Sequence, residues 1–131
     1  MITDDPEDYW IRIRPSKGTV AWGLVETADW VHHGGKFLIF GPKGQLDRLA
    51  RDLDVYVEDG TIRSVKYNRE PGVSKSTVMC VYCLDDEQEQ IRGFLDSLGV
   101  TKPIWKYDRQ TIKDWRPSGR LHWKAQQLDS S

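Results

Sequence analysis

Lysine and arginine side chains recur at strand-like positions, and they are the residues of this chain with the clearest capacity for chemistry. These cations are Lys36, Arg63, Lys66, Arg69, Lys75 and Lys106. Adjacent strands lie about 4.8 Å apart, so cations on one sheet face can converge on a shared anion. The spacing fits an anion site for phosphate, a nucleotide or a phosphopeptide. It also fits a solvated face with paired charges, which alternating charge in strands favours.

The two cysteines, Cys80 and Cys83, form a CVYC tetrapeptide inside an uncharged strand-like run. A redox CxxC pair normally has its first thiol at a helix N-terminus. Side chains alternate along a strand, so these two thiols are expected on opposite faces of the sheet. No second cysteine pair or zinc-finger histidine spacing accompanies them. The pattern therefore predicts buried structural thiols and no metal site.

Other residue types give weaker signals. The GPKG segment at 41–44 lacks the trailing Lys-Ser/Thr of a phosphate loop and predicts a tight turn. His32 and His33 lie on a predicted loop, where either could act as an acid or base, although most exposed loop histidines are inert. Four of the six tryptophans could stack on a base or belong to the core: Trp10, Trp22, Trp105 and Trp115.

Length and charge limit the class of protein. The chain has 131 residues, which predicts a single domain over 1–131. Its 19 Lys and Arg against 20 Asp and Glu give a net charge of −1, which argues against a generally basic nucleic-acid-coating protein. No apolar run approaches membrane-spanning length, and the first residues are acidic, so we expect a cytoplasmic protein.

The elements that position these residues centre on 77–98. Residues 77–84 carry no charge and predict a strand buried on both faces. Asp86 and Glu89 resemble a capping box, and Gly99 is an expected helix stop. Between them, one apolar stripe predicts an amphipathic helix: Ile91, Phe94, Leu95 and Leu98.

The rest of the chain supplies further elements. Alternation predicts strands at 9–14 and 62–68, and two further short strands are predicted at 36–40 and 104–107. An apolar stripe predicts a second helix at 45–53. A short helix or an irregular segment is expected at 19–31 and a helical turn at 111–115, whereas 1–8 and 129–131 are expected to be flexible.

Together these elements predict an α+β domain. We expect an antiparallel-rich mixed sheet with two main helices packed on one face. Connections between the middle strands are short, which leaves antiparallel or ferredoxin-like split β-α-β pairing. The face opposite the helices is then expected to be partly open and to carry the polar side chains.

Four segments, in this order and spacing, carry a resemblance to a known family: GGKFLIFGPKGQLDRLARDL, TIRSVKYN, STVMCVYCLDD and WKYDRQT. They resemble the family of the basophilic-leukaemia expressed protein, which is associated with phosphothreonine lyase domains. The likeness covers residues 9–121. It implies a fold similar to the cap-binding translation initiation factor, with the sheet backed by helices.

The same resemblance implies a candidate reaction. Bacterial effector phosphothreonine lyases, which are similar to this chain only loosely, remove phosphate by β-elimination with a lysine base and an assisting histidine. Lys66 matches the base position, whereas Leu38 occupies the histidine position. The chain therefore lacks the residue that would assist the departing phosphate, unless His32, His33 or His122 replaces it.

We expect a non-catalytic or weakly catalytic domain that binds a phosphorylated small molecule, peptide or RNA end. The predicted ligand-binding residues are Lys36, Lys66, Arg69, Lys75, Lys106, Asp108 and Thr111. Asp108 and Thr111 are expected to hold Lys106 and the last turn in place. We expect no cofactor and no membrane partner. The alternatives are a phosphothreonine lyase with Lys66 as its catalytic base, and a protein-interaction module built on Trp105, Trp115 and Trp123.

Overall fold

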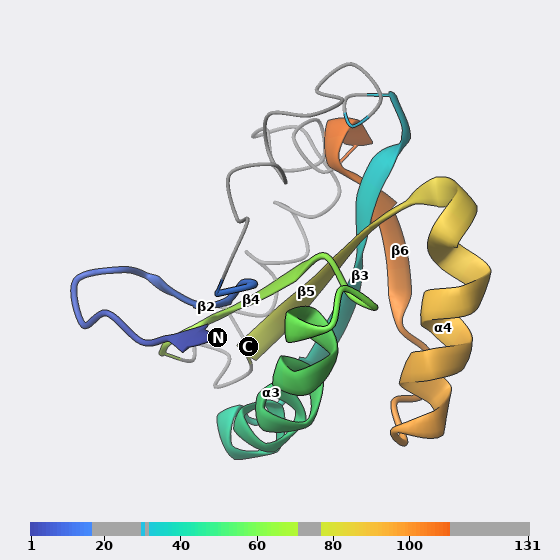
Figure 1. Ribbon diagram of the computed structural model, residues 1–131. Coiled ribbons are helices and arrows are strands. Elements are labelled where there is room, and N and C mark those ends of the chain that lie inside the picture. The colour runs from blue at the N-terminus through green and yellow to red at the C-terminus, as the bar shows by residue number, and fades with distance from the viewer. Residues whose placement is uncertain (17–29, 31, 71–76, 111–131) are drawn as a thin grey trace, which may run out of the picture.

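The computed structural model describes residues 1–16, 30, 32–70 and 77–110. Its elements are β1 (Ile2–Thr3), β2 (Trp10–Ile13), β3 (Gly34–Gly41), α3 (Lys43–Glu58), β4 (Ser64–Asn68), β5 (Thr77–Leu84), the 3-10 turn η1 (Asp85–Glu87), α4 (Gln88–Ser97) and β6 (Ile104–Tyr107). They form a six-stranded antiparallel sheet with two main helices (Figure 1). The predicted α+β class is confirmed. The described strands pair only antiparallel, so the expected mixed sheet is wrong in that respect.

The strands lie in the order β1-β2-β4-β5-β3-β6. Strands β3 and β4 therefore run in the same direction on either side of β5, and α3 connects them. Helix α4 connects β5 to β6 in the same manner, with β3 between these two strands. Each is a split β-α-β connection, in which a helix links two strands that a third separates.

Both helices contribute to one hydrophobic core on one face of the sheet. From α3 and α4 the buried side chains are Leu46, Leu49, Ala50, Leu53, Val57, Ile91 and Leu95. From the strands they are Ile11, Ile13, Phe37, Ile39, Val65, Tyr67, Met79, Val81 and Cys83. Alternate strand residues thus point toward the helices, as the period of two requires.

Helix α3 is longer than the predicted 45–53. It continues to Glu58 because the apolar stripe extends from Leu53 to Val57, and both side chains are fully buried. The ring of Tyr56 also contacts that of Phe94 at 4.4 Å between centroids, which joins α3 to α4. The β-branched Val55 and Val57 weaken the intrinsic helix propensity of this end, and tertiary packing overrides that preference.

The start of α4 differs from the predicted Asp86 and Glu89 capping pair. The chain first makes the 3-10 turn, and the Glu87 carboxylate accepts a hydrogen bond from the backbone N–H of Leu84 at 2.8 Å. The predicted stop is confirmed, because Gly99 has a φ of 86°, in the left-handed region that glycine tolerates best.

The two cysteines follow the predicted arrangement. Both are free and buried in β5, where Cys83 belongs to the helix-side core and Cys80 to a small cluster on the opposite face. Burial raises the pKa of Cys83 to about 12, which keeps its thiol protonated.

Predictions for residues 19–29, 111–115 and 129–131 lie outside the described residues. Within the described residues, neither helix is long and apolar enough to cross a membrane.

Candidate cation site on the sheet face opposite the helices

Strand register brings several cations to the sheet face opposite the helices. Arg12 pairs with Lys66, which pairs with Cys80 on β5. In the next row, Tyr82 pairs with Lys36, which pairs with Lys106 on β6. Directly paired residues share a face, so four cations from four strands lie on one side of the sheet. We refer to Arg12, Lys36 and Lys66, with the rings of Trp10 and Tyr82, as the cation site.

Lys66 is the central member of the cation site. Its ammonium lies 4.2 Å from the ring centroid of Trp10 and 5.8 Å from that of Tyr82. Within the described part of the chain, no hydrogen bond or ion pair joins this ammonium to an acceptor. The two rings offer cation–π attraction, which is weaker than pairing with a carboxylate in a partly dry site.

Lys36 differs from Lys66 because a carboxylate holds it. Its ammonium donates to Asp108 Oδ1 at 3.0 Å, and the side chain is only 11% exposed. Asp108 also accepts a hydrogen bond from the indole N–H of Trp30 at 2.6 Å. This three-residue chain fixes the end of β6 against β3.

The pKa of the Lys66 amine lies below its ordinary value. Burial disfavours the charged ammonium, and the nearby Lys36 and Arg12 cations repel it, while Cys80 and Asp108 act in the opposite direction. Arg12 is itself paired with Asp8 at 2.8 Å. Three cations therefore face two carboxylates, and Lys66 is the cation that neither carboxylate contacts.

The middle of this face is buried, whereas the sequence led us to expect a partly open face. Leu38, Cys80 and Tyr82 are 6%, 4% and 9% exposed and form a second, smaller hydrophobic cluster. Exposure rises toward β2 and β4, where Trp10, Arg12 and Lys66 are half-buried. The cation site is thus partly desolvated and lies beside a buried hydrophobic cluster.

The other predicted ligand-binding residues lie in three places. The guanidinium of Arg69 is bound by Asp4 and by the backbone carbonyls of Asp5 and Asp8, which ties β4 to the N-terminal segment. Lys106 lies on β6 beside Lys36. Lys75 and Thr111 lie outside the described residues, as do Trp22, Trp115, Trp123 and His122.

Gly34 and Gly35, at the start of β3, leave the space in which two tryptophan rings pack. A Cβ atom at Gly34 would lie 2.3 Å from the Trp30 ring, and one at Gly35 would lie 2.6 Å from both the Trp105 ring and the Lys106 carbonyl. Real Cβ atoms do not come this close to other atoms. Trp105 is half-buried against Phe37, with ring centroids 5.2 Å apart, on the helix side.

His33 has its own partners, apart from the cation site. Its Nδ1 lies 3.0 Å from Asp85 Oδ2, which also accepts a hydrogen bond from the Tyr107 hydroxyl at 3.2 Å. These contacts lower the pKa of the Asp85 carboxyl. Tyr107 is on the same face of β6 as Trp105, opposite to that of Lys106. The geometry therefore does not bring His33 to Lys66.

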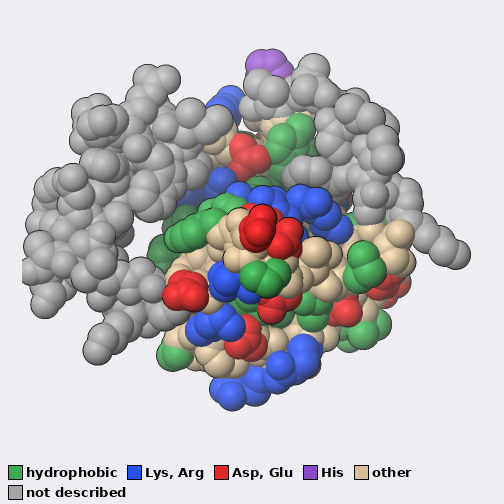
Figure 2. Space-filling model, turned by 90° about the vertical axis from the view of Figure 1, so that its left-hand side faces the viewer, with side chains coloured by type: hydrophobic (Ala, Val, Ile, Leu, Met, Phe, Trp, Pro, Cys, Tyr) green, Lys and Arg blue, Asp and Glu red, His purple; other side chains and the backbone are tan. Residues whose placement is uncertain are grey.

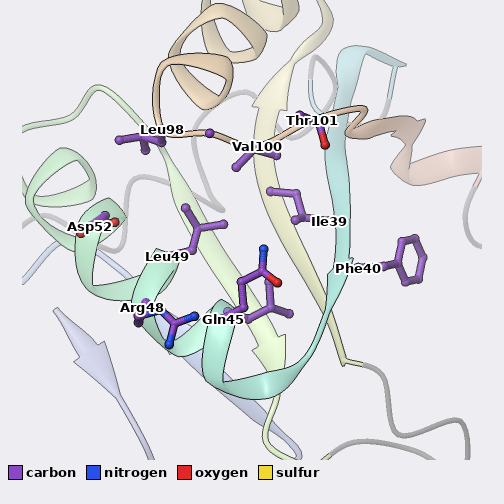
Figure 3. Close-up of a pocket in the computed structure, with 11 residues that line it drawn as sticks. Ile39, Phe40, Gln45, Arg48, Leu49, Asp52, Leu98, Val100 and Thr101 are labelled. Carbon is purple, nitrogen blue, oxygen red and sulfur yellow. The ribbon is translucent and has the colours of Figure 1, made fainter.

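A hollow of about 240 Å³ lies on the helix side of the molecule. Figure 3 shows it between α3, β3 and the segment after α4, with Phe40 pointing away from it. Arg48, Asp52 and Gln45 give it some polar lining, but they contribute no concentration of one charge. Figure 2 likewise shows Lys and Arg interspersed with Asp and Glu on the surface it draws.

Sequence reasoning did not select Arg12, Tyr82 or Trp30 as site residues. The alternation of 9–14 places Trp10 and Arg12 on one face, which was the available signal for Arg12. Tyr82 sits in a continuous apolar run without alternation, so its face could not be assigned. Only the strand register and the resulting contacts place Arg12 and the Tyr82 ring beside Lys66.

Comparisons with known proteins found no relative of this chain. No protein-family model, curated protein or solved structure matches the chain. The resemblance to the basophilic-leukaemia expressed protein family therefore stays a prediction, and the argument about function depends on the geometry of the cation site.

Proposed function

We propose that the protein binds a phosphorylated ligand at the cation site: a nucleotide, an RNA end or a phosphopeptide. The observation that carries this proposal is the Lys66 ammonium, which lies beside two other cations and has no carboxylate partner in the described residues. A bound phosphate would neutralise the excess charge and accept the hydrogen bonds that Lys66 can donate.

Holding Lys66 partly desolvated beside Lys36 and Arg12 costs stability, and the contacts that Lys66 makes with the described residues offset little of that cost. Proteins tolerate such a local loss of stability at sites where a ligand binds.

We infer that the ferredoxin-like arrangement describes the sheet more closely than the cap-binding factor does, because α3 and α4 both make split β-α-β connections.

Calorimetric titration tests the proposal. The natural chain and Lys66→Ala would each be titrated with inorganic phosphate, a nucleoside monophosphate and a phosphothreonine peptide. We expect binding of at least one probe, weakened by about tenfold to a hundredfold in Lys66→Ala, since charge-assisted hydrogen bonds contribute about 1.5–3 kcal/mol.

Lys43→Ala is the matched control, because Lys43 is also half-buried but pairs with Asp47 on α3. It should bind as the natural chain does. Absence of binding by the natural chain, or equal binding by Lys66→Ala, would remove the proposal.

A phosphothreonine lyase is the second candidate, favoured by the lowered pKa of the Lys66 amine, which suits a general base. Leu38 fills the position of the assisting histidine and is buried beside Cys80, while His33 is held by Asp85. Incubating a phosphothreonine peptide with the protein would yield dehydrobutyrine, visible by mass spectrometry. No such product at stoichiometric protein concentration would exclude this reaction.

A further inference from the structure

Lys66 differs from other lysines of the described chain in what its nitrogen contacts. The ammonium groups of Lys36 and Lys43 each lie 3.0 Å from a carboxylate oxygen. The Lys66 nitrogen faces the rings of Trp10 and Tyr82. Loss of a proton from Lys36 or Lys43 would break an ion pair, whereas loss of a proton from Lys66 breaks no ion pair within the described residues.

We propose that the Lys66 amine is a nucleophile that forms an imine with a small aldehyde or ketone carrying a phosphate group. This inference rests on the proposed function, because the same cation site would hold the phosphate. The neutral amine adds its lone pair to the carbonyl carbon to give a carbinolamine. The carbonyl oxygen then leaves as water with both former amine hydrogens, so no oxidant or reductant is needed.

Three features of the cation site favour this chemistry. An amine reacts only when neutral, and a partly desolvated lysine next to other cations is neutral more often than a solvated one. The cations beside Lys66 attract an anionic substrate and leave the nitrogen itself without a carboxylate. The rings of Trp10 and Tyr82 exclude part of the water around the nitrogen, which favours the dehydrated imine.

The burial of the middle of this sheet face favours a small substrate over a macromolecule. A strand of RNA laid across the sheet would have to contact the middle of this face, but Leu38, Cys80 and Tyr82 are almost fully buried. The half-buried side chains Trp10, Arg12 and Lys66 lie at the β2–β4 side. A phosphorylated aldehyde needs contact with these residues alone.

Trapping with borohydride tests the inference. Pyridoxal 5′-phosphate serves as the probe, because it combines an aldehyde with a phosphate, and reduction converts its imine to a stable amine for peptide mapping. We expect Lys66 to be labelled at least about tenfold faster than Lys43, because the held phosphate positions the aldehyde beside the amine. Inorganic phosphate should protect Lys66, and pyridoxal without phosphate should label both lysines alike.

The variant Lys66→Arg completes the experiment. Lys66→Arg keeps the positive charge, so it should lose the fast label and retain phosphate binding by calorimetry, with an unchanged circular dichroism spectrum as the check on folding. Labels spread evenly over the exposed lysines, with phosphate binding intact, would overturn the imine inference and leave the proposed function standing. Even labels together with no phosphate binding would overturn both.

Discussion

The two faces of the same sheet are built on different principles. Toward the helices, strands β2 to β5 and both helices form one apolar cluster in which Phe37, Leu53, Met79 and Leu95 are fully buried. Away from the helices, β3 and β5 present a smaller cluster of three buried hydrophobic residues, Leu38, Cys80 and Tyr82, bordered by charged groups and aromatic rings. A single pattern of alternation thus separates a large apolar face from a smaller face that is partly charged.

The contrast shows where the molecule can tolerate an unfavourable group. The helix-side core supplies hydrophobic stabilisation from both helices and the strands. Compared with that stabilisation, the free energy lost by partly burying the Lys66 ammonium is small. Its face is therefore the one on which substitutions should change binding more than folding.

The largest effect on stability is expected when the same substitution, leucine to alanine, is made on each face of the sheet. Leu53→Ala removes a fully buried side chain between α3 and the sheet, and should lower the free energy of unfolding by about 3–5 kcal/mol. Leu38→Ala, in the smaller cluster, should cost about 2 kcal/mol. Urea denaturation measures both values. Equal losses would show that the two faces contribute alike to stability.

A smaller effect is expected at the charged border of the second face. Asp108→Asn removes the carboxylate that holds Lys36 and accepts from Trp30, so it should lower the free energy of unfolding by about 1–2 kcal/mol. It also leaves Lys36 without a counter-charge, so phosphate should bind more tightly. Glu89→Gln, a neutralisation on α4, is the control for net charge. Weaker phosphate binding by Asp108→Asn would contradict the assignment of the cation site.

Replacing the central lysine should stabilise the protein slightly. The folded-state pKa of Lys66 is lowered, so burying its ammonium costs stability below that pKa, and the cost disappears as the pH rises from the folded-state pKa toward 10.5. Lys66→Met removes the cost at all pH values. We expect the melting temperature at pH 7 to rise by roughly 2–4 °C while phosphate binding is lost. A lower melting temperature would show that Lys66 supports the fold.

The smallest effect is expected from a charge pair at the end of β5. Burial acts to raise the pKa of Glu87, but hydrogen bonds from Arg63 and the Leu84 N–H outweigh it, so the pKa is lowered below 4.5. The stability it contributes is present above pH 4.5 and is lost as the pH falls through the folded-state value. Glu87→Gln should cost about 0.5 kcal/mol at pH 7. In acid denaturation, the difference from the natural chain should shrink as the pH falls below 4.5 and through the folded-state pKa.

Local patterns predicted most of the scaffold. Residues 77–84 form the strand that their uncharged run predicts, and the stripe from Ile91 to Leu95 faces the core. The pattern of the first eight residues does not predict β1, because two residues are too few to show alternation. The cation site depends on register between strands distant in sequence, such as Lys66 opposite Arg12, and no local pattern contains that information.

The Gly34–Gly35 pair has a consequence for how this sequence can vary. Each glycine leaves space that an indole ring already occupies, that of Trp30 on one side of β3 and that of Trp105 on the other. A chain that acquires a side chain at either position must give up or move the matching tryptophan. Glycine and tryptophan at these four positions should therefore change together in related chains, and loss of Gly34 would release the indole that now donates to Asp108.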